Sequence, residues 1–483
     1  MKRRFVTNLI FLLSLNVFIK SFWILGVDRG VQNALPAQDY GIYFALLNLT
    51  FLFNIILDFG ITNYNNRIIA QHPQLIGKYF SRIVPIKFSL AVLFTVVVFT
   101  FALIAGYSAF ELKLLGWLCF AQFLSSLTLY LRSNISGLLM FKTDSVLSVM
   151  DRFLMVVFCS LLLWSGILKT QFRIEFFVYA QVIAYLITAI IALLICLKHT
   201  GFIRLRWNKA FVLKVIKDCY PYALLVLLMA FYNRADSVMI ERMLGDKGAD
   251  YASVYASAFR LVDAANMIAY LFAVILLPLF ARMIKQHKDV TPIIKISFHL
   301  LLVTSVTFAL ISLFYGDDLM KALYNKHIEA SGEVYKVLAF CFVPISMTYI
   351  FGTLLTANGS LKKLNLVASL GMVLNVGINL ILIPRYEALG AAYSSLIAQT
   401  VTAALQAAIA IKIFGIAIKK SYVYKILWFL VIISINTYLL KNGAINWIVN
   451  VIIAVFVILF TSLLFKIFNL KDFIRLIRSS NEE

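Results

Sequence analysis

Residues 363–384 read KLNLVASLGMVLNVGINLILIP, and the only charged side chain in this run is the first, Lys363. A helix that crosses the hydrocarbon core of a bilayer needs about 20 consecutive apolar residues. In lipid, a single segment of this length satisfies its backbone hydrogen bonds only as a helix. The run therefore predicts a membrane-spanning helix.

The same pattern recurs along the whole chain, in runs bounded by charged or turn residues. The predicted spans cover residues 5–27, 38–60, 82–106, 112–140, 145–168, 174–197, 219–244, 251–281, 291–315, 334–357, 363–384, 389–414, 421–440 and 445–468. Their ends are defined to within several residues. The predicted fold class is all-α, a polytopic membrane protein with about 14 transmembrane helices.

The composition agrees with lipid as the main solvent of the chain. Of the 483 residues, 62% are hydrophobic and 14% are charged, and the mean hydropathy is +0.91. A soluble domain is about 45–50% apolar and about 25% charged. The net charge of +22 is spread over short connections, with no basic domain large enough to hold a duplex, so nucleic acid is excluded as a partner.

The basic residues alternate between successive connections. With the N-terminus placed in the cytoplasm, inward connections such as 198–218 are basic, whereas outward ones such as 316–333 are near balance. The positive-inside rule produces this alternation only when the span count is nearly right. We expect a bacterial inner-membrane protein with both termini cytoplasmic, whose basic start Lys2-Arg3-Arg4 precedes a retained first span.

The cysteines and histidines indicate neither a disulfide framework nor a metal site. The five cysteines lie in or at the ends of apolar runs without a CxxC pair, and the five histidines are scattered without ligand spacing. Buried thiols usually behave as small hydrophobic groups. We expect no metal and no cofactor, and leave open a coupling ion, H⁺ or Na⁺.

A short motif occurs twice, as QDYGIY at 38–43 and as ADYASVY at 249–255. Each copy follows a span with an embedded positive charge, Lys20 or Arg234. Two-lobe repetition around a midplane site is typical of alternating-access transporters. The predicted organisation is an N-lobe at 1–200, a cytoplasmic basic connector at 201–218, a C-lobe at 219–416, two further helices at 417–470 and a cytoplasmic tail at 471–483.

Polar side chains within predicted spans are the candidates for substrate binding, because a charge at the bilayer centre costs about 2.5–3.5 kcal/mol or more. Asn233, Arg234 and Asp236 lie near the middle of the seventh span, where they either face a cavity or form a structural ion pair between helices. Asn16 and Lys20 share a face of the first span, and Lys20 either faces the cavity or reaches the outer interface.

The eighth and fourth spans hold further candidates for substrate binding. Arg260 and Asp263 stand three residues apart, so they either pair with each other or line the cavity. Arg132 gives the fourth span a polar cytoplasmic end, at which it could equally be solvated. A cleft that gathers Lys20, Arg234 and Arg260 would be positive and would attract a phosphate-bearing substrate.

A second group of residues is expected to act in structure or gating. Its members are Asp58, Gly60, Arg67, Pro278, Asn375 and Asn379. The first three form the polar end of the second span, and the proline can bend the eighth. The two asparagines stack one turn apart, which favours hydrogen bonds between helices. Lys87, a further cation, stands close enough to a cytoplasmic end to extend its ammonium to the interface.

Two stretches resemble bacterial polysaccharide-biosynthesis flippases. One runs from NRAD at 233–236 to FRL at 259–261, and the other joins NVGINLILIP at 375–384 to LGAA at 389–392. Span number and loop sizes resemble that family over nearly the whole chain, as does the turn DFG at 58–60. These patterns mark the multidrug/oligosaccharidyl-lipid/polysaccharide (MOP) exporter superfamily better than any one substrate.

The resemblance implies two lobes with inward-open and outward-open states, and an undecaprenyl-pyrophosphate-linked oligosaccharide, such as an O-antigen unit, as cargo. Lipid II flippases of this superfamily carry cationic cavity residues in their first and eighth helices. Lys20 and Arg260 sit in comparable places, with lysine in place of arginine in the first helix. The implied partners are the polyprenyl-pyrophosphate-linked sugar, membrane lipids and the polymerase and glycosyltransferase machinery of the polysaccharide.

Three functions remain to be separated. A flippase that is not an enzyme fits the embedded cations best. A multidrug or ion antiporter on the same fold would use embedded carboxylates, for which Asp58, Asp236 and Asp263 are candidates. A membrane-embedded polysaccharide polymerase or ligase would need a large outer loop, and the longest one, 316–333, is short. The sequence shows no nucleophile–base pair and no phosphate-binding loop.

Overall fold

The structure is a computed structural model that describes residues 18–19, 22–138, 140–164, 172–200, 206–416, 420–442 and 446–465. Within these ranges every regular element is a helix, which confirms the predicted all-α class. The chain divides by its contacts into two compact units, Met1–Ser253 and Val254–Glu483. The predicted lobe boundaries stay a prediction.

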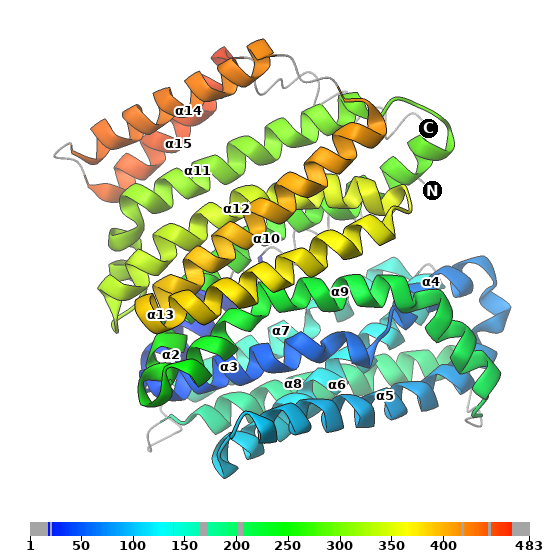
Figure 1. The fold of residues 1–483 in the computed structure, drawn as a ribbon. Coiled ribbons are helices and arrows are strands. Elements are labelled where there is room, and N and C mark those ends of the chain that lie inside the picture. Colours follow the sequence, from blue (N-terminus) through cyan, green and yellow to red (C-terminus); the bar gives the residue numbers. More distant parts are fainter. Residues whose placement is uncertain are drawn as a thin grey trace. The chain divides into compact units, whose positions relative to one another are not determined.

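The first unit is a bundle in which α6 packs against α8, α4 and α3, while α7 packs on α8 and α9 packs on α3 (Figure 1). Its helices are α2 (Arg29–Ala34), α3 (Ala37–Phe53), α4 (Ile61–Gln71), α5 (Ile76–Ile104), α6 (Ala109–Gly137), α7 (Phe141–Trp164), α8 (Ile174–Thr200) and α9 (Lys209–Met243). A π-helix at Trp23–Asp28 precedes α2, and short 3₁₀ turns occupy Asn54–Leu57, Pro73–Leu75 and Gly245–Lys247. The first turn of α10 (Gly248–Lys285) also belongs to this unit.

In the second unit, α12 packs against both α11 and α13, and a hairpin of α14 and α15 packs on α11. Besides the rest of α10, the helices are α11 (Thr291–Leu323), α12 (Ile328–Ala357), α13 (Leu361–Phe414), α14 (Lys420–Lys441) and α15 (Trp447–Leu464). The long α13 is broken at Glu387, whose φ of 54° and ψ of −131° are not helical. A span needs about 20 residues, so the 54 residues of α13 provide two spans.

Twelve helices in the described ranges are long and apolar enough to cross a membrane. Because α13 provides two spans, these helices account for thirteen crossings. The first predicted span, 5–27, lies largely outside the ranges that the structure describes. The predicted count of fourteen is consistent with this arrangement.

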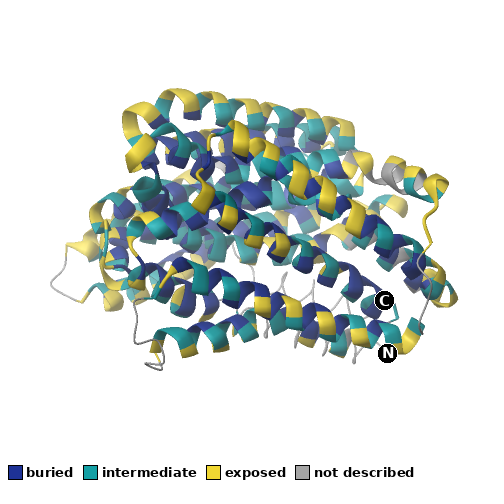
Figure 2. Cartoon of the chain, turned by 90° about the horizontal axis from the view of Figure 1, so that it is seen from below, coloured by how far each residue is buried: buried dark blue, intermediate teal, exposed yellow. Residues whose placement is uncertain are grey.

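The helix α5 is apolar on both its buried and its exposed sides. Ile83, Leu90 and Phe94 are buried, whereas Val92 and Val96 are exposed. A helix that is apolar all round is typical of a membrane span. Buried and exposed residues alternate along other helices in the same way, and many of the exposed ones are large hydrophobic residues (Figure 2).

The second predicted span, 38–60, ends earlier than expected. The α-helix stops at Phe53, a 3₁₀ turn follows, and the backbone then takes left-handed values at Phe59 (φ 47°) and Gly60 (φ 80°). Gly60 takes such a value without steric cost because it has no Cβ. The break ends α3 and starts α4, a separate helix that the sequence did not predict.

Candidate functional site

A buried ion pair lies at the break between α3 and α4. The ammonium of Lys87 on α5 is 2.5 Å from Oδ1 of Asp58, and Lys87 is 1% exposed. Lys87 also donates to the carbonyl oxygen of Leu57 (3.0 Å) and to the hydroxyl oxygen of Ser126 on α6 (3.1 Å). Asp58 in turn accepts from the backbone N–H of Thr62 in α4 (3.3 Å). The pair thus ties three helices to the break.

The expectation that Lys87 reaches the interface is therefore wrong. A lysine extends its ammonium to the interface when solvation there costs less free energy than burial of the ammonium beside a partner within the protein. Here the helix break places a backbone carbonyl, a carboxylate and a hydroxyl within reach of the ammonium. Asp58, predicted to act in structure or gating, lies at the centre of this network.

Arg132 lies on α6 and is joined to α7. Its Nε donates to Oδ1 of Asp144 over 2.8 Å, and the two side chains are 19% and 15% exposed. A paired arginine of this kind is held by a helix contact rather than by solvent. Whether Arg132 also contacts a substrate stays a prediction.

The three candidates on α9 take different positions. Asp236 is buried, at 1% exposure, while Asn233 is half-buried and donates to the backbone carbonyl of Met229 at 2.8 Å. Arg234 is half-buried, and its guanidinium carbon lies 5.3 Å from the centre of the Phe51 ring on α3. Contacts of this length between a cation and an aromatic face are attractive. Arg234 is thus held near the middle of a membrane-length helix.

The candidates of the second unit occupy α10 and α13. Arg260 and Asp263 are half-buried and lie about one turn apart on α10. Asn375 and Asn379 are both fully buried, and Asn379 donates to the side-chain oxygen of Asn375 at 3.4 Å. The backbone carbonyl of Asn375 accepts from Ser394 (2.8 Å), which lies beyond the break in α13. This hydrogen bond joins the two halves of α13.

Some predicted residues lie outside what the structure describes. Asn16 and Lys20 fall in undescribed ranges, and the side chains of Arg67 and Pro278 are likewise undescribed. Their predicted roles in substrate binding or gating stay predictions. A cleft that gathers Lys20, Arg234 and Arg260 also stays a prediction.

Sequence reasoning missed a cluster centred on Arg242 at the end of α9. Arg242 pairs with Glu241 and, over 2.8 Å, with Glu111 on α6, and its guanidinium lies 3.7 Å from the centre of the Tyr107 ring. Tyr107 donates to Glu241 over 3.1 Å, and burial raises the pKa of Tyr107, so that its hydroxyl stays a donor. Glu111 also forms a capping box with Ser108. Glu111 lies just after the turn that precedes α6 and Glu241 just before the turn that follows α9, so both acids resembled surface charges in the sequence.

The two copies of the repeated motif contact each other. Gln38 donates to Oδ2 of Asp250 at 3.3 Å, and Gly41 packs so closely that a Cβ at this position would lie 1.7 Å from the carbonyl oxygen of Ala249. Only glycine fits such a backbone approach. Nearby, Gln32 donates to the backbone carbonyl of Ser253 at 3.1 Å. The first turn of α10 is thereby fastened to α2 and α3.

Helices long and apolar enough to cross a membrane, with buried polar and charged groups among them, define this chain as a polytopic membrane protein. Its fold resembles that of solved structures described as MOP superfamily transporters. Residues 8–285 match the family model described as "Polysaccharide biosynthesis protein", and the chain belongs to this family.

Three solved structures illustrate the likeness in fold. The lipid II flippase MurJ in an inward closed conformation matches with a TM-score of 0.72 and 15% identity, over 94% of this chain and 98% of its own. An inward-facing multidrug resistance MATE family transporter of the MOP superfamily gives 0.63 and 13%, over 84% and 98%. A MOP superfamily transporter from Pyrococcus furiosus gives 0.55 and 12%, over 85% and 94%. No curated protein matches the sequence significantly.

Proposed function

We propose that this protein is a flippase for an undecaprenyl-pyrophosphate-linked oligosaccharide. It moves the sugar from the cytoplasmic to the outer leaflet of a bacterial inner membrane by alternating access. The polyprenyl tail stays in lipid while the sugar and the pyrophosphate cross a hydrated, positively charged passage. Membership of the polysaccharide biosynthesis family supports a substrate of this class.

The observation that carries the proposal is the position of Arg234. It lies near the middle of the span Tyr222–Met243 and is half-buried against an aromatic ring. A cation at this depth is costly, and cations within membrane spans usually face a wet cavity or a partner. Arginine offers two parallel N–H donors to phosphate oxygens, and the low dielectric around it strengthens its attraction for an anion.

The cargo is tested by reconstituting the protein into vesicles that contain a fluorescent polyprenyl-pyrophosphate-linked oligosaccharide. We expect Arg234→Ala, and likewise Arg260→Ala, to lower the flipping rate by about tenfold or more, because one charge-assisted hydrogen bond contributes about 1.5–3 kcal/mol. Arg385→Ala removes an exposed arginine and is the matched control. Full activity of both variants in correctly inserted protein would refute the cationic passage.

An antiporter of cationic drugs is the second candidate function. Two carboxylates within the first unit, those of Asp28 and Asp236, are each 1% exposed, and embedded carboxylates suit cationic substrates. Deletion of the protein separates the two functions. Accumulation of one lipid-linked sugar on the cytoplasmic leaflet supports the flippase, whereas drug sensitivity without such accumulation supports the antiporter.

A further inference from the structure

The first turns of α9 precede the part of this helix that can cross the membrane. The helix begins at Lys209, whereas its membrane-length stretch runs from Tyr222 to Met243. Asn208 caps the helix, because its side-chain oxygen accepts from the backbone N–H of Phe211 at 2.9 Å. The turns before Tyr222 are therefore expected at the edge of the bilayer, next to the lipid headgroups.

Phe211 holds these turns against the start of α5. Its ring packs edge-to-face on Tyr79, with the ring centres 5.5 Å apart, and the guanidinium carbon of Arg82 lies 5.6 Å from its centre. Just before the helix, the backbone N–H of Arg206 donates to the carbonyl oxygen of Ser81 at 2.9 Å. One side of the segment is thus fastened to the bundle.

The opposite side of the segment is exposed and mixes cations with apolar residues. Four exposed side chains follow the three- and four-residue spacing of one helix face, and they are Lys209, Leu213, Lys217 and Tyr220. Together with the exposed Arg206 and Trp207, which precede the helix, they form the connector stripe. Three of its members are large and apolar or aromatic, with exposed fractions of 53% for Trp207, 69% for Leu213 and 56% for Tyr220.

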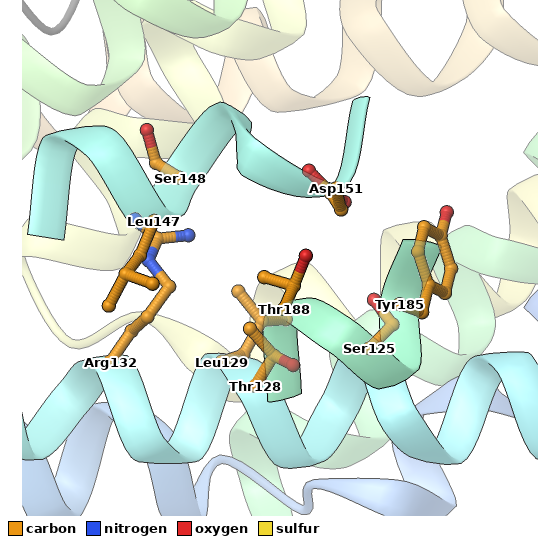
Figure 3. Close-up of a pocket in the computed structure, with 9 residues that line it drawn as sticks. All are labelled: Ser125, Thr128, Leu129, Arg132, Leu147, Ser148, Asp151, Tyr185 and Thr188. Carbon is orange, nitrogen blue, oxygen red and sulfur yellow. The ribbon is translucent and has the colours of Figure 1, made fainter. Parts of the chain in front are cut away.

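The cations of the connector stripe lack the carboxylate partners that other cations of the first unit have. Arg132 extends from α6 toward α7 (Figure 3), where its Nε donates to Asp144 over 2.8 Å. No Asp or Glu occurs between Glu175 and Asp218, so the segment of the stripe contains none. The start of α5, on which it is docked, adds none either, because residues 59–110 also contain no carboxylate. The stripe is therefore positive and complements an anion.

We propose that the connector stripe binds the headgroups of anionic phospholipids. Its three cations contact the phosphates, while Trp207, Leu213 and Tyr220 enter the boundary between headgroups and acyl chains. Basic and aromatic side chains on one face of a helix are typical of segments that lie in this boundary. A soluble anion would leave the three large side chains in water, whereas a lipid accommodates both parts of the stripe. This binding is independent of the proposed cargo.

Trp207 reports which lipid lies beside the stripe. The full-length protein is reconstituted into vesicles of phosphatidylglycerol and phosphatidylcholine at one fixed ratio, with bromine on the acyl chains of only one of the two lipids. Bromine quenches tryptophan fluorescence on contact, and the signal of Trp207 is the part that is lost in Trp207→Phe. We expect phosphatidylglycerol to quench Trp207 several-fold more per lipid than phosphatidylcholine does, and this preference to fall as NaCl is added.

The charges of the stripe are tested by removing all three. Arg206→Gln/Lys209→Gln/Lys217→Gln should bring the preference close to one, because each Lys or Arg near an anionic surface strengthens binding by about fivefold. The charge-retaining variant Arg206→Lys/Lys209→Arg/Lys217→Arg should keep it. Equal quenching by the two lipids in the wild type, or an unchanged preference in the glutamine variant, overturns the proposal.

Two further measurements separate this site from a general effect of charge. Lys113→Gln/Lys247→Gln/Arg385→Gln also removes two exposed lysines and one exposed arginine, away from the stripe, and should keep the preference of the wild type. Inorganic phosphate, added at constant ionic strength, should leave the quenching unchanged. Displacement of the lipid by phosphate would indicate a site for a soluble anion and also overturns the proposal.

Discussion

Lys87 shows how a charged side chain inside a membrane span obtains its partners from neighbouring helices. It occupies the same buried face of α5 as Ile83, Leu90 and Phe94, and this helical spacing was readable in the sequence. Its partner could not be read, because Asp58 lies on another helix and is presented by a backbone break. The partner of Arg132 could not be predicted either, because its pairing with Asp144 depends on how α6 and α7 pack. The sequence identifies the charged residues that are costly to place in a membrane span, whereas the packing of the helices determines their partners.

Removing Lys87 tests the value of this pair. Lys87→Met should lower the free energy of unfolding by about 3 kcal/mol, because it leaves the carboxylate of Asp58 without a counter-charge. Unfolding in detergent, measured by the loss of helical circular dichroism, reports the change. The double variant Lys87→Met/Asp58→Asn should recover part of the loss. A double variant that loses the sum of the two single effects would contradict a coupled pair.

Among the helices, the apolar runs predicted well which segments are helical and predicted poorly where the helices are interrupted. The twelve membrane-length helices follow the predicted runs. The end of α3 and the break in α13 depend on left-handed residues such as Phe59 and Glu387, which are not glycines. A non-glycine residue in this conformation is held there by its surroundings. Periodicity therefore does not reveal it.

The contact between α3 and the first turn of α10 can be tested by cross-linking. Gln38→Cys/Asp250→Cys should form a disulfide on mild oxidation, because the native side chains hydrogen-bond at these positions. Adding Gly41→Ala should reduce the cross-link several-fold, since its Cβ would overlap the carbonyl oxygen of Ala249. Gly116→Ala is the control, as its Cβ would meet only ordinary contact at 3.6 Å. Equal cross-linking in the two variants would refute the close approach.

For the whole molecule, composition alone indicated the lipid environment, and the alternation of basic connections predicts the topology. The all-α class and the family followed from the same apolar runs and short motifs. The candidate site was less predictable, because the distance between charges on different helices is set by packing. The cluster at Arg242 shows this, since its partners Glu111 and Tyr107 lie far away in the sequence.

The predicted topology is tested by labelling single cysteines in a variant without the five native ones. A cysteine at Asp246, an exposed residue in the turn between α9 and α10, should react with a membrane-impermeant maleimide added outside intact spheroplasts. A cysteine at the exposed Lys363, in the first turn of α13, should react only after the membrane is permeabilised. The reverse pattern would invert the orientation.

The contact between the two motif copies is expected to couple the evolution of the two segments that contain them. Gly41 leaves room for the backbone at Ala249, and Gln38 bonds to Asp250, so each copy is part of the other's environment. A larger residue at 41 would be tolerated only alongside a compensating change near 249. Relatives of this chain should therefore show correlated substitutions between 38–43 and 249–255, as though an ancestral duplication had left its two products unable to drift independently.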